Sequence, residues 1–226
     1  MLTLLEEKKR RESRNRVKTL YPDDGPFRRD LYAKHTEFFA AGSEFNERAI
    51  LGGNRSGKTL GGAFEMTCHL TGLYPRWWRG KTFEEPICAW CAGDTGKTVR
   101  DILQREMLGP PGDEAAHGTG MIPGDAIVST SNKYGLADAY ESVRIKHRDG
   151  AASILQFKSY DQGREAFQGT SQHVIWLDEE CPMDIYTECL LRTMTTNGIV
   201  YLTATPLLGL TELMLSFLPE LQPTVQ

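Results

Sequence analysis

The sequence of 226 residues lacks the features that mark membrane, secreted and strongly basic proteins. No apolar run approaches the ~18 residues that a membrane-spanning helix needs, and the charged start has no apolar core of signal-peptide length. The formal net charge is -4, with 26 Lys and Arg against 30 Asp and Glu. We therefore expect a cytosolic protein without a membrane partner, in which any contact with nucleic acid depends on a local patch.

The chain has only five cysteines, an odd number scattered through expected helices and strands. This favours a reducing compartment over a disulfide framework. Cys88 and Cys91 have C-x-x-C spacing, but they lie in an apolar run that is typical of a strand, and no second pair of metal ligands is near them. We expect both to be buried strand residues.

Two regions are expected from length and charge. Residues 5–18 carry dense charge of both signs and precede a turn cluster at 21–26, which predicts an N-terminal charged helical arm over residues 1–27. The arm is either a solvated helical face or a surface that binds DNA or a partner. The remaining residues, 28–226, have the length and the apolar content of one domain.

The most specific motif is a phosphate loop of the pattern G-x-x-x-x-G-K-[ST]. Its residues are Gly52, Gly53, Asn54, Arg55, Ser56, Gly57, Lys58 and Thr59. A short apolar strand over 48–51 precedes the loop and a helix over 58–71 is expected to follow it, which is the context that the motif requires. Backbone N–H groups and the helix N-terminus would face the phosphates of ATP, with Lys58 on the β and γ phosphates and Thr59 on Mg²⁺.

Further strands and helices alternate along the chain, which predicts an α/β fold with a mainly parallel central sheet flanked by helices. Strands are expected over 86–92, 173–180 and 199–206, with helices over 28–41 and 182–192 and a third beginning near Asp94. Residues 142–148 and 152–159 alternate in polarity around Asp149-Gly150, which predicts a β-hairpin insertion. Residues 109–133 are rich in Gly, Pro, Ser and Thr and are expected to form a long loop.

A second chemical element is the apolar strand that ends in Asp178, Glu179 and Glu180. A carboxylate at the C-terminal end of a buried parallel strand lies where open α/β sheets bind ligands, so Asp178 is the candidate that holds Mg²⁺. Glu179 is the candidate general base for the attacking water. The alternative is a plain strand followed by an acidic helix start.

The strand over 199–206 ends in small hydroxyl residues, and Thr203, Ala204 and Thr205 are candidates for coupling to the γ phosphate. Thr203 and Thr205 are expected to hydrogen-bond the attacking water or Glu179. Phosphoryl transfer needs further positive charge, for which Arg55 and Arg164 are candidates, the latter toward the nucleotide of a neighbouring subunit.

Two segments have open interpretations. Trp77 and Trp78 lie between arginines, an arrangement that stacks on bases in some proteins, although packing is the preferred interpretation. Gly96-Lys97-Thr98 resembles the end of a second phosphate loop, but its nearest glycine leaves too few residues to wrap a phosphate. We expect a helix start there, with contact to a phosphate of a polymer as the alternative.

Four segments together resemble the N-terminal ATPase domain of tailed-phage large terminases, the motors that package viral DNA. These are residues 52–59, 157–169, 175–180 and 202–210. The resemblance implies a RecA-like P-loop NTPase of the additional-strand, catalytic-glutamate type. It implies a viral protein of the host cytoplasm that hydrolyses ATP with Mg²⁺ to move double-stranded DNA into a procapsid. The implied partners are the portal protein, the small terminase and further copies of the chain in a ring, usually a pentamer.

The resemblance assigns Lys58 and Thr59 to phosphate and Mg²⁺, Asp178 to Mg²⁺, Glu179 to catalysis and Arg55 to sensing of the γ phosphate. The sequence departs from the family in two respects. His35 stands in the segment where the family commonly has a glutamine that reads adenine, so we expect contact of His35 with the base. The family's nuclease domain does not follow, so we expect a truncated chain or natural fragment without nuclease activity.

Two other functions stay open. One is a helicase or translocase lobe acting on nucleic acid. The other is a nucleotide-dependent assembly module in which turnover is not essential.

Overall fold

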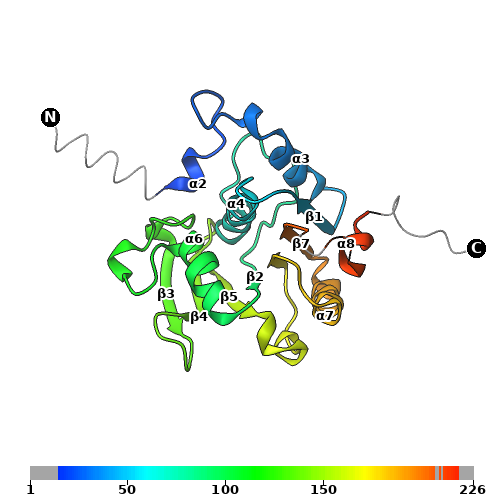
Figure 1. The fold of residues 1–226 in the computed structure, drawn as a ribbon. Coiled ribbons are helices and arrows are strands. Elements are labelled where there is room, and N and C mark those ends of the chain that lie inside the picture. Colours follow the sequence, from blue (N-terminus) through cyan, green and yellow to red (C-terminus); the bar gives the residue numbers. More distant parts are fainter. Residues whose placement is uncertain (1–14, 207–208, 210, 219–226) are drawn as a thin grey trace, which may run out of the picture.

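A central sheet of seven strands organises the residues that the computed structural model describes, which are 15–206, 209 and 211–218. The strand order is β1-β7-β6-β2-β5-β4-β3, from one side of Figure 1 to the other. The strands are β1 (Glu47–Leu51), β2 (Cys88–Gly93), β3 (Ile127–Asn132), β4 (Tyr140–Lys146), β5 (Ala152–Ser159), β6 (Val174–Asp178) and β7 (Ile199–Ala204).

Strands β1, β7, β6, β2 and β5 are paired in parallel, and β4 runs antiparallel to both of its neighbours. The expected mainly parallel sheet and the hairpin of β4 and β5 are therefore confirmed. The expected loop over 109–133 is wrong at its end, because residues 127–132 form β3. This strand is short and rich in hydroxyl side chains, and it pairs with β4 with register shifts, so its conformation depends on pairing rather than on an apolar pattern.

Helices cover the sheet on both faces. The α-helices are α2 (Arg16–Thr19), α3 (Ala33–Ala41), α4 (Lys58–Thr71), α5 (Gly96–Thr98), α6 (Arg105–Leu108), α7 (Met183–Thr193) and α8 (Glu212–Ser216). A π-helix, η2 (Val99–Gln104), joins α5 to α6. The 3₁₀ turns are η1 (Arg29–Tyr32), η3 (Glu114–Ala116), η4 (Gly124–Ala126), η5 (Tyr160–Gln162), η6 (Arg164–Phe167) and η7 (Met194–Thr196).

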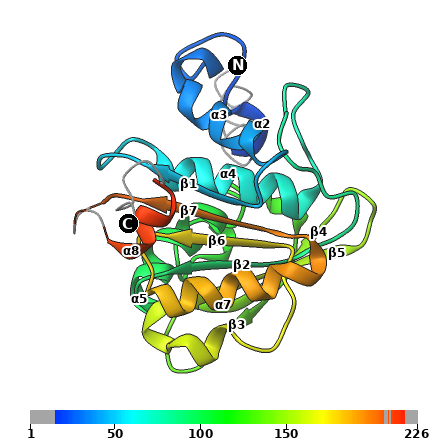
Figure 2. The same ribbon diagram turned by 90° about the vertical axis from the view of Figure 1, so that its right-hand side faces the viewer.

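Figure 2 shows α4 and α7 on opposite faces of the sheet, with α3 beyond α4. Each face has its own apolar core. Phe64 and Trp176 belong to the core beneath α4, and Ile175 and Ile185 belong to the core beneath α7. Successive strand residues point to opposite faces, so Ile175 and Trp176 of β6 enter different cores. None of the helices within the described ranges has the length and apolarity to cross a membrane.

Helix α4 has the predicted bounds because a glycine in the left-handed region lies at each end. Gly57 precedes it with φ 82° and Gly72 follows it with φ 69°. The backbone N–H of Gly72 donates to the carbonyl of Cys68, which satisfies one of the last carbonyls of the helix. The helix is buried along most of its length, so its N-terminal end is held firmly at the phosphate loop.

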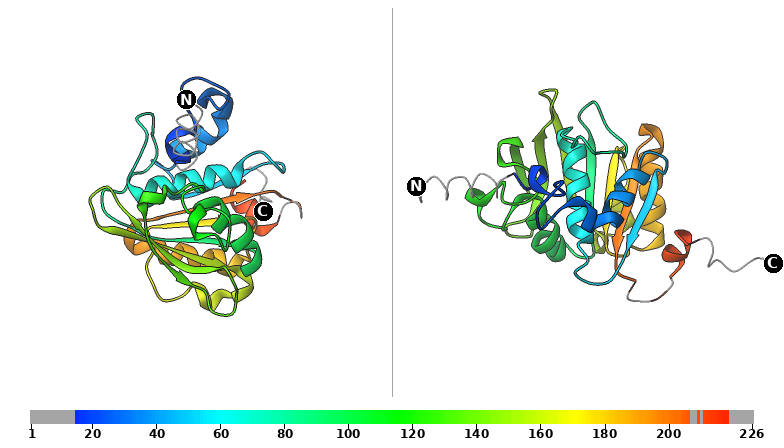
Figure 3. Two further views of the ribbon diagram at one scale, coloured as in Figure 1. Left: turned by 90° about the vertical axis from the view of Figure 1, so that its left-hand side faces the viewer. Right: turned by 90° about the horizontal axis from the view of Figure 1, so that it is seen from above.

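The described part of the N-terminal segment belongs to the core. The expected helix over 5–18 lies mostly outside the described residues, of which α2 is the first element. Val17 is 6% exposed and Tyr21 is 1% exposed. The Tyr21 ring packs edge-on against five aromatic rings, including Phe64 and Trp77. Val17 and Tyr21 therefore pack this segment on α4, which Figure 3 shows beside it, whereas residues 23–27 are exposed.

The two tryptophans of the turn after α4 serve packing. Trp77 stacks on Phe64 with ring centroids 6.0 Å apart and an interplanar angle of 5°. Trp78 stacks on Phe39 at 5.4 Å. Both rings contact the core beneath α4, which supports packing rather than base stacking as their role.

Candidate active site

The phosphate loop connects β1 to α4 and holds its lysine in place through the backbone. Lys58 Nζ donates to the carbonyls of Gly52 and Gly53, each at 2.9 Å. An ammonium group has three N–H donors, so one is left for an anion in the loop. The first N–H groups of α4 point the same way, and the helix dipole favours negative charge there. The loop therefore has the donors that a polyphosphate requires.

Asp178 brings the second predicted element to the loop. It lies at the end of β6, and its Oδ1 accepts hydrogen bonds from the hydroxyls of Thr59 at 3.1 Å and Thr203 at 2.5 Å. Thr59 and Asp178 are 119 residues apart in the sequence. The structure thus joins the two candidate Mg²⁺ ligands at the carboxyl edge of the sheet, as predicted.

These side chains fit a Mg²⁺ ion by their chemistry. Hydroxyl and carboxylate oxygens are the donors that Mg²⁺ prefers. The Thr59 hydroxyl gives its hydrogen to Asp178, so its lone pairs stay free for a cation. Burial raises the pKa of Asp178 to about 6, against the lowering effect of the two hydroxyl donors. A bound cation would favour the ionised carboxylate and offset this cost of burial.

Glu179 follows Asp178 in the left-handed backbone region, with φ 63°. Its backbone N–H donates to the carbonyl of Thr203 at 2.8 Å, and its Oε2 accepts from the backbone N–H of Thr205 at 3.0 Å. The Thr205 hydroxyl donates to Asn54 Oδ1 at 3.2 Å. The chain after β7 thus contacts both the candidate base and the phosphate loop.

The three candidate coupling residues, Thr203, Ala204 and Thr205, have different contacts. Thr205 contacts Glu179 as expected, although through its backbone. The Thr203 hydroxyl is directed to Asp178 rather than to Glu179, because the register pairs Thr203 with Asp178 across β6 and β7. Its expected contact with the attacking water stays a prediction. Ala204 is fully buried at the end of β7, and its carbonyl accepts from the N–H of Gly52.

Tyr160 is a residue of the site that the sequence did not single out. It is 6% exposed, and its hydroxyl lies 3.1 Å from the carbonyl of Asp178, 3.2 Å from that of Glu179 and 3.3 Å from that of Ala92. Burial raises the pKa of this phenol, so it stays a donor. Its contacts fix the backbone that turns between Asp178 and Glu179. The only sequence signal was its position in the segment 157–169.

His35 lies under the phosphate loop. It is 5% exposed, its Nδ1 is 2.8 Å from the Tyr21 hydroxyl, and it hydrogen-bonds the Ser56 backbone. A Cβ at Gly57 would lie 3.1 Å from its Cε1. The ring is therefore enclosed by the chain in this structure, and the expected contact of His35 with adenine stays a prediction. Burial lowers the pKa of His35, which favours the neutral ring.

The two candidate arginines lie in different surroundings. Arg55 is exposed in the loop, with φ 63°. Arg164, in η6, is held by Glu188 of α7, with Nε at 3.0 Å and Nη2 at 2.9 Å from Oε2. Arg192 binds the other oxygen of Glu188 at 3.0 Å. The Arg164 side chain is 49% exposed, and its role toward a neighbouring subunit stays a prediction.

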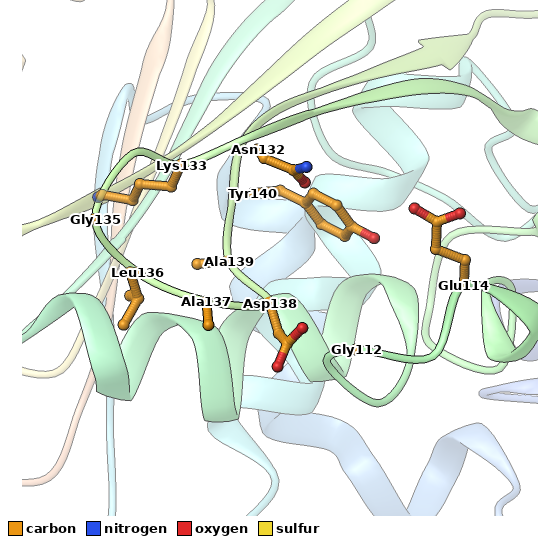
Figure 4. A pocket seen from close by; sticks show the side chains of 10 residues that line it. All are labelled: Gly112, Glu114, Asn132, Lys133, Gly135, Leu136, Ala137, Asp138, Ala139 and Tyr140. Carbon is orange, nitrogen blue, oxygen red and sulfur yellow. The ribbon is translucent and has the colours of Figure 1, made fainter.

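One groove of the described residues lies away from this site. It has a volume of about 560 Å³ and is formed by the β3–β4 loop and the segment around Gly112. Figure 4 shows Asp138 directed toward Gly112 and the Tyr140 hydroxyl directed toward Glu114, with Lys133 and Leu136 at the other end. Neither Lys58 nor Asp178 lines it. We assign the candidate site to the phosphate loop and the end of β6, because these segments supply the lysine, hydroxyl and carboxylate groups that bind a nucleotide with Mg²⁺.

Comparison with known proteins identifies a family and several relatives. The family described as "Terminase large subunit, T4likevirus-type, N-terminal" matches residues 49–226. The large subunit of the terminase of Salmonella phage P22 is 37% identical over 204 residues, which are 83% of this chain and 41% of that protein. The chain thus spans about two fifths of the length of this relative.

Solved structures show the same fold at low identity. The large terminase ATPase domain of Thermus phage P74-26 matches with a TM-score of 0.52 and 14% identity, over 77% of this chain and 68% of that one. The large terminase of bacteriophage D6E in complex with ADP matches with a TM-score of 0.55 and 13% identity, over 83% and 42%. These likenesses confirm the expected RecA-like fold.

Proposed function

Because this chain belongs to the family of terminase large subunits, in their T4likevirus-type N-terminal part, we propose that it hydrolyses ATP with Mg²⁺ to drive double-stranded DNA into a procapsid. The carrying observation is the contact of Thr59 with Asp178, with Glu179 next in the chain. This contact brings the phosphate loop to Asp178, the candidate metal ligand, and thus close to Glu179, the candidate base. The D6E relative was solved with ADP, which supports a nucleotide as the ligand.

Each side chain of the site has a role in this proposal. The free donor of Lys58 and the N-terminus of α4 bind the phosphates, and Thr59 and Asp178 hold the metal. Mg²⁺ supplies charge that neutralises the phosphate oxygens during transfer. Glu179 accepts a proton from the attacking water, a task for which a carboxylate one water away from the γ phosphate is suited. Tyr160 keeps the backbone of both carboxylates in place.

The partners in this proposal are the portal protein, the small terminase and further copies of the chain in a ring of five, in the host cytoplasm. Arg55 senses the γ phosphate within its own loop. Arg164 leaves Glu188 and reaches the nucleotide of a neighbouring subunit. Absence of nuclease activity from this chain is part of the proposal, and incubation of the chain with supercoiled DNA and Mg²⁺ or Mn²⁺ tests it.

Phosphate release from Mg²⁺-ATP tests the central claim. Glu179→Gln keeps the size of the side chain and removes the base, so we expect release to fall by roughly 10²–10⁴-fold, with binding of ATP nearly unchanged. Glu180→Gln is the matched control because Glu180 contacts Thr211 instead of the loop, and it should release phosphate like the wild type. Unchanged release by Glu179→Gln would contradict the assignment.

A packaging assay with the full-length protein separates the motor from an assembly module. We expect the Glu179→Gln protein to bind procapsids and to package no DNA. Packaging by this variant at the wild-type level would favour the assembly module, in which turnover is not essential.

A further inference from the structure

A tryptophan beneath the phosphate-loop helix is connected to the metal-holding carboxylate by two successive hydrogen bonds. Trp176 Nε1 donates to Thr203 Oγ1 at 2.7 Å, and Thr203 Oγ1 donates to Asp178 Oδ1 at 2.5 Å. Trp176 and Thr203 are fully buried, and Asp178 is 7% exposed. Solvent therefore has little access to compete for these bonds.

The register of β6 and β7 creates this arrangement. Trp176 is opposite Tyr201, and Asp178 is opposite Thr203. Residues two apart in a strand point to the same face, so all four side chains face α4. The indole of Trp176 is long enough to reach its diagonal neighbour, Thr203, across the strand pair.

The chemistry of the indole determines which group donates in each of these two hydrogen bonds. An indole N–H can only donate, so Thr203 must accept from Trp176. The single hydrogen of the Thr203 hydroxyl is then left for Asp178. Within the described part of the chain, both hydroxyl donors, Thr59 and Thr203, use Oδ1 of Asp178. The carboxylate is thereby held in one orientation, with Oδ2 as the oxygen without a hydroxyl donor.

The indole is also fixed by packing. It stacks on Tyr201, with ring centroids 6.2 Å apart and an interplanar angle of 17°. A Cβ at Gly62 of α4 would lie only 2.5 Å from its Cε2. The Tyr201 hydroxyl donates to the carbonyl of Gly62 at 2.9 Å. Helix α4 begins with Lys58 and Thr59. The Trp176 indole therefore also positions the helix that carries these two residues of the site.

We propose that Trp176 is a positioning residue for metal binding, acting through Thr203 on Asp178 and through Gly62 on α4. This inference rests on the proposed function, because it assumes that Asp178 and Thr59 hold Mg²⁺ beside a nucleotide. Partners of this kind orient metal ligands, and their loss typically weakens metal affinity by 10–100-fold. The competing interpretation is that Trp176 only fills the core.

Trp176→Phe in the intact chain separates the two interpretations, because phenylalanine keeps an aromatic ring and removes the N–H. The measurement is a Mg²⁺ titration of the binding of a fluorescent, non-hydrolysable ATP analogue. We expect the Mg²⁺ midpoint to rise by about 10-fold or more, while binding without metal changes by less than about threefold.

Trp90→Phe is the matched control. Trp90 is 1% exposed, and its Nε1 donates to Gln156 Oε1 at 2.8 Å, outside the site. The control loses the same atoms, and we expect its Mg²⁺ midpoint to stay at the wild-type value. Equal midpoints for the two variants would overturn the inference, since packing alone would then explain Trp176.

Thr203 provides a second test that does not depend on the fold of the tryptophan variant. Thr203→Val should raise the Mg²⁺ midpoint as Trp176→Phe does, the double variant should add little, and Thr203→Ser should restore the wild-type midpoint. In ¹⁵N-labelled protein, Thr203→Val should shift the indole N–H resonance of Trp176 and leave that of Trp90 in place. An unshifted Trp176 resonance would overturn the inference.

Phosphate release by the wild type, measured in parallel, reports on the proposed function separately. A chain whose Mg²⁺-dependent nucleotide binding depends on Trp176, but which releases no phosphate, would contradict hydrolysis and support the positioning role.

Discussion

The Glu179 carboxylate accepts a hydrogen bond from the backbone N–H of Thr205 at 3.0 Å. The hydroxyl of the same threonine donates to Asn54 in the phosphate loop. One residue after β7 therefore contacts the candidate base through its backbone and the loop through its side chain. A change in the loop on nucleotide binding can reach the base through this single residue.

Thr205→Val breaks the contact with Asn54 and keeps the backbone bond to Glu179. We expect kcat for ATP hydrolysis to fall by about three- to tenfold, because a neutral hydrogen bond contributes about 1 kcal/mol, while ADP affinity stays within about twofold. Thr195→Val is the control, since its hydroxyl contacts only Ser171 among the described residues. A parallel loss of ADP affinity would show that the contact shapes the loop rather than coupling it to the base.

Two adjacent glycines of α4 should respond oppositely to alanine. At Gly62 a Cβ would meet the Trp176 ring at 2.5–2.7 Å, whereas at Gly61 it would lie 3.5–3.7 Å from His35. We expect Gly62→Ala to lower the free energy of unfolding by about 1–3 kcal/mol through overpacking. Gly61→Ala should be neutral or stabilising by up to about 1 kcal/mol through helix propensity. Urea unfolding checks both, and equal effects would contradict the packing described.

The ion pair of Arg48 with Glu65 is buried beneath the loop strand. Its atoms are 2.6 Å apart, and the side chains are 4% and 1% exposed. Glu65→Gln leaves Arg48 buried without a counter-charge, so we expect a loss of about 3–5 kcal/mol in the free energy of unfolding. Glu37→Gln breaks the exposed pair with Lys34 and should cost less than about 1 kcal/mol. A small effect of Glu65→Gln in denaturant melts would mean that water reaches the pair.

The raised pKa of Asp178 predicts a specific pH dependence. Burial raises it from 3.8 to about 6, so in metal-free protein the folded state holds a proton that the unfolded state releases. The free energy of unfolding should therefore fall, by on the order of 3 kcal/mol, as the pH rises from about 4 to about 6. Asp178→Asn removes this contribution.

The wild type and Asp178→Asn should be compared at pH 4.5 and pH 7 in EDTA. His35 and His69, whose pKa values burial lowers, act in the opposite direction but are present in both proteins. The difference between the two proteins isolates Asp178, and a difference independent of pH would contradict the raised pKa.

Arg164 should matter in the assembled motor and not in the isolated chain. If it reaches a neighbouring nucleotide, Arg164→Ala should lower phosphate release on procapsids with DNA by on the order of 10³-fold, with basal release by the isolated chain unchanged. Arg192→Ala is the control because Arg192 binds the same Glu188. Equal losses for both variants would indicate that Arg164 only holds η6 to α7.

The loop, α4 and the hairpin could be predicted because local chemistry determines them. Gly57 and Gly72 mark the ends of α4, and Asp149-Gly150 turns the chain between β4 and β5. The meeting of Thr59 with Asp178 was also predictable, since parallel strands that end in functional residues share one edge of the sheet.

Other features depend on contacts between segments distant in the sequence. β3 is a strand because it pairs with β4. The bond from Trp176 to Thr203 depends on the register of β6 with β7, which no pattern in either segment shows. His35 stands at a position expected to read a base, yet Tyr21 and the glycine face of α4 enclose its ring.

Helix α4 has one further mechanical consequence. Its 14 residues span about 21 Å, from the phosphates to the turn that carries Trp77 and Trp78. Gly62 lets the first half of the helix pack closely against Trp176 of the sheet, and Phe64 of the helix stacks on Trp77. We therefore expect the helix to move as a rigid unit. A tilt of its first turn should displace its last turn as well, at the turn that carries Trp77 and Trp78.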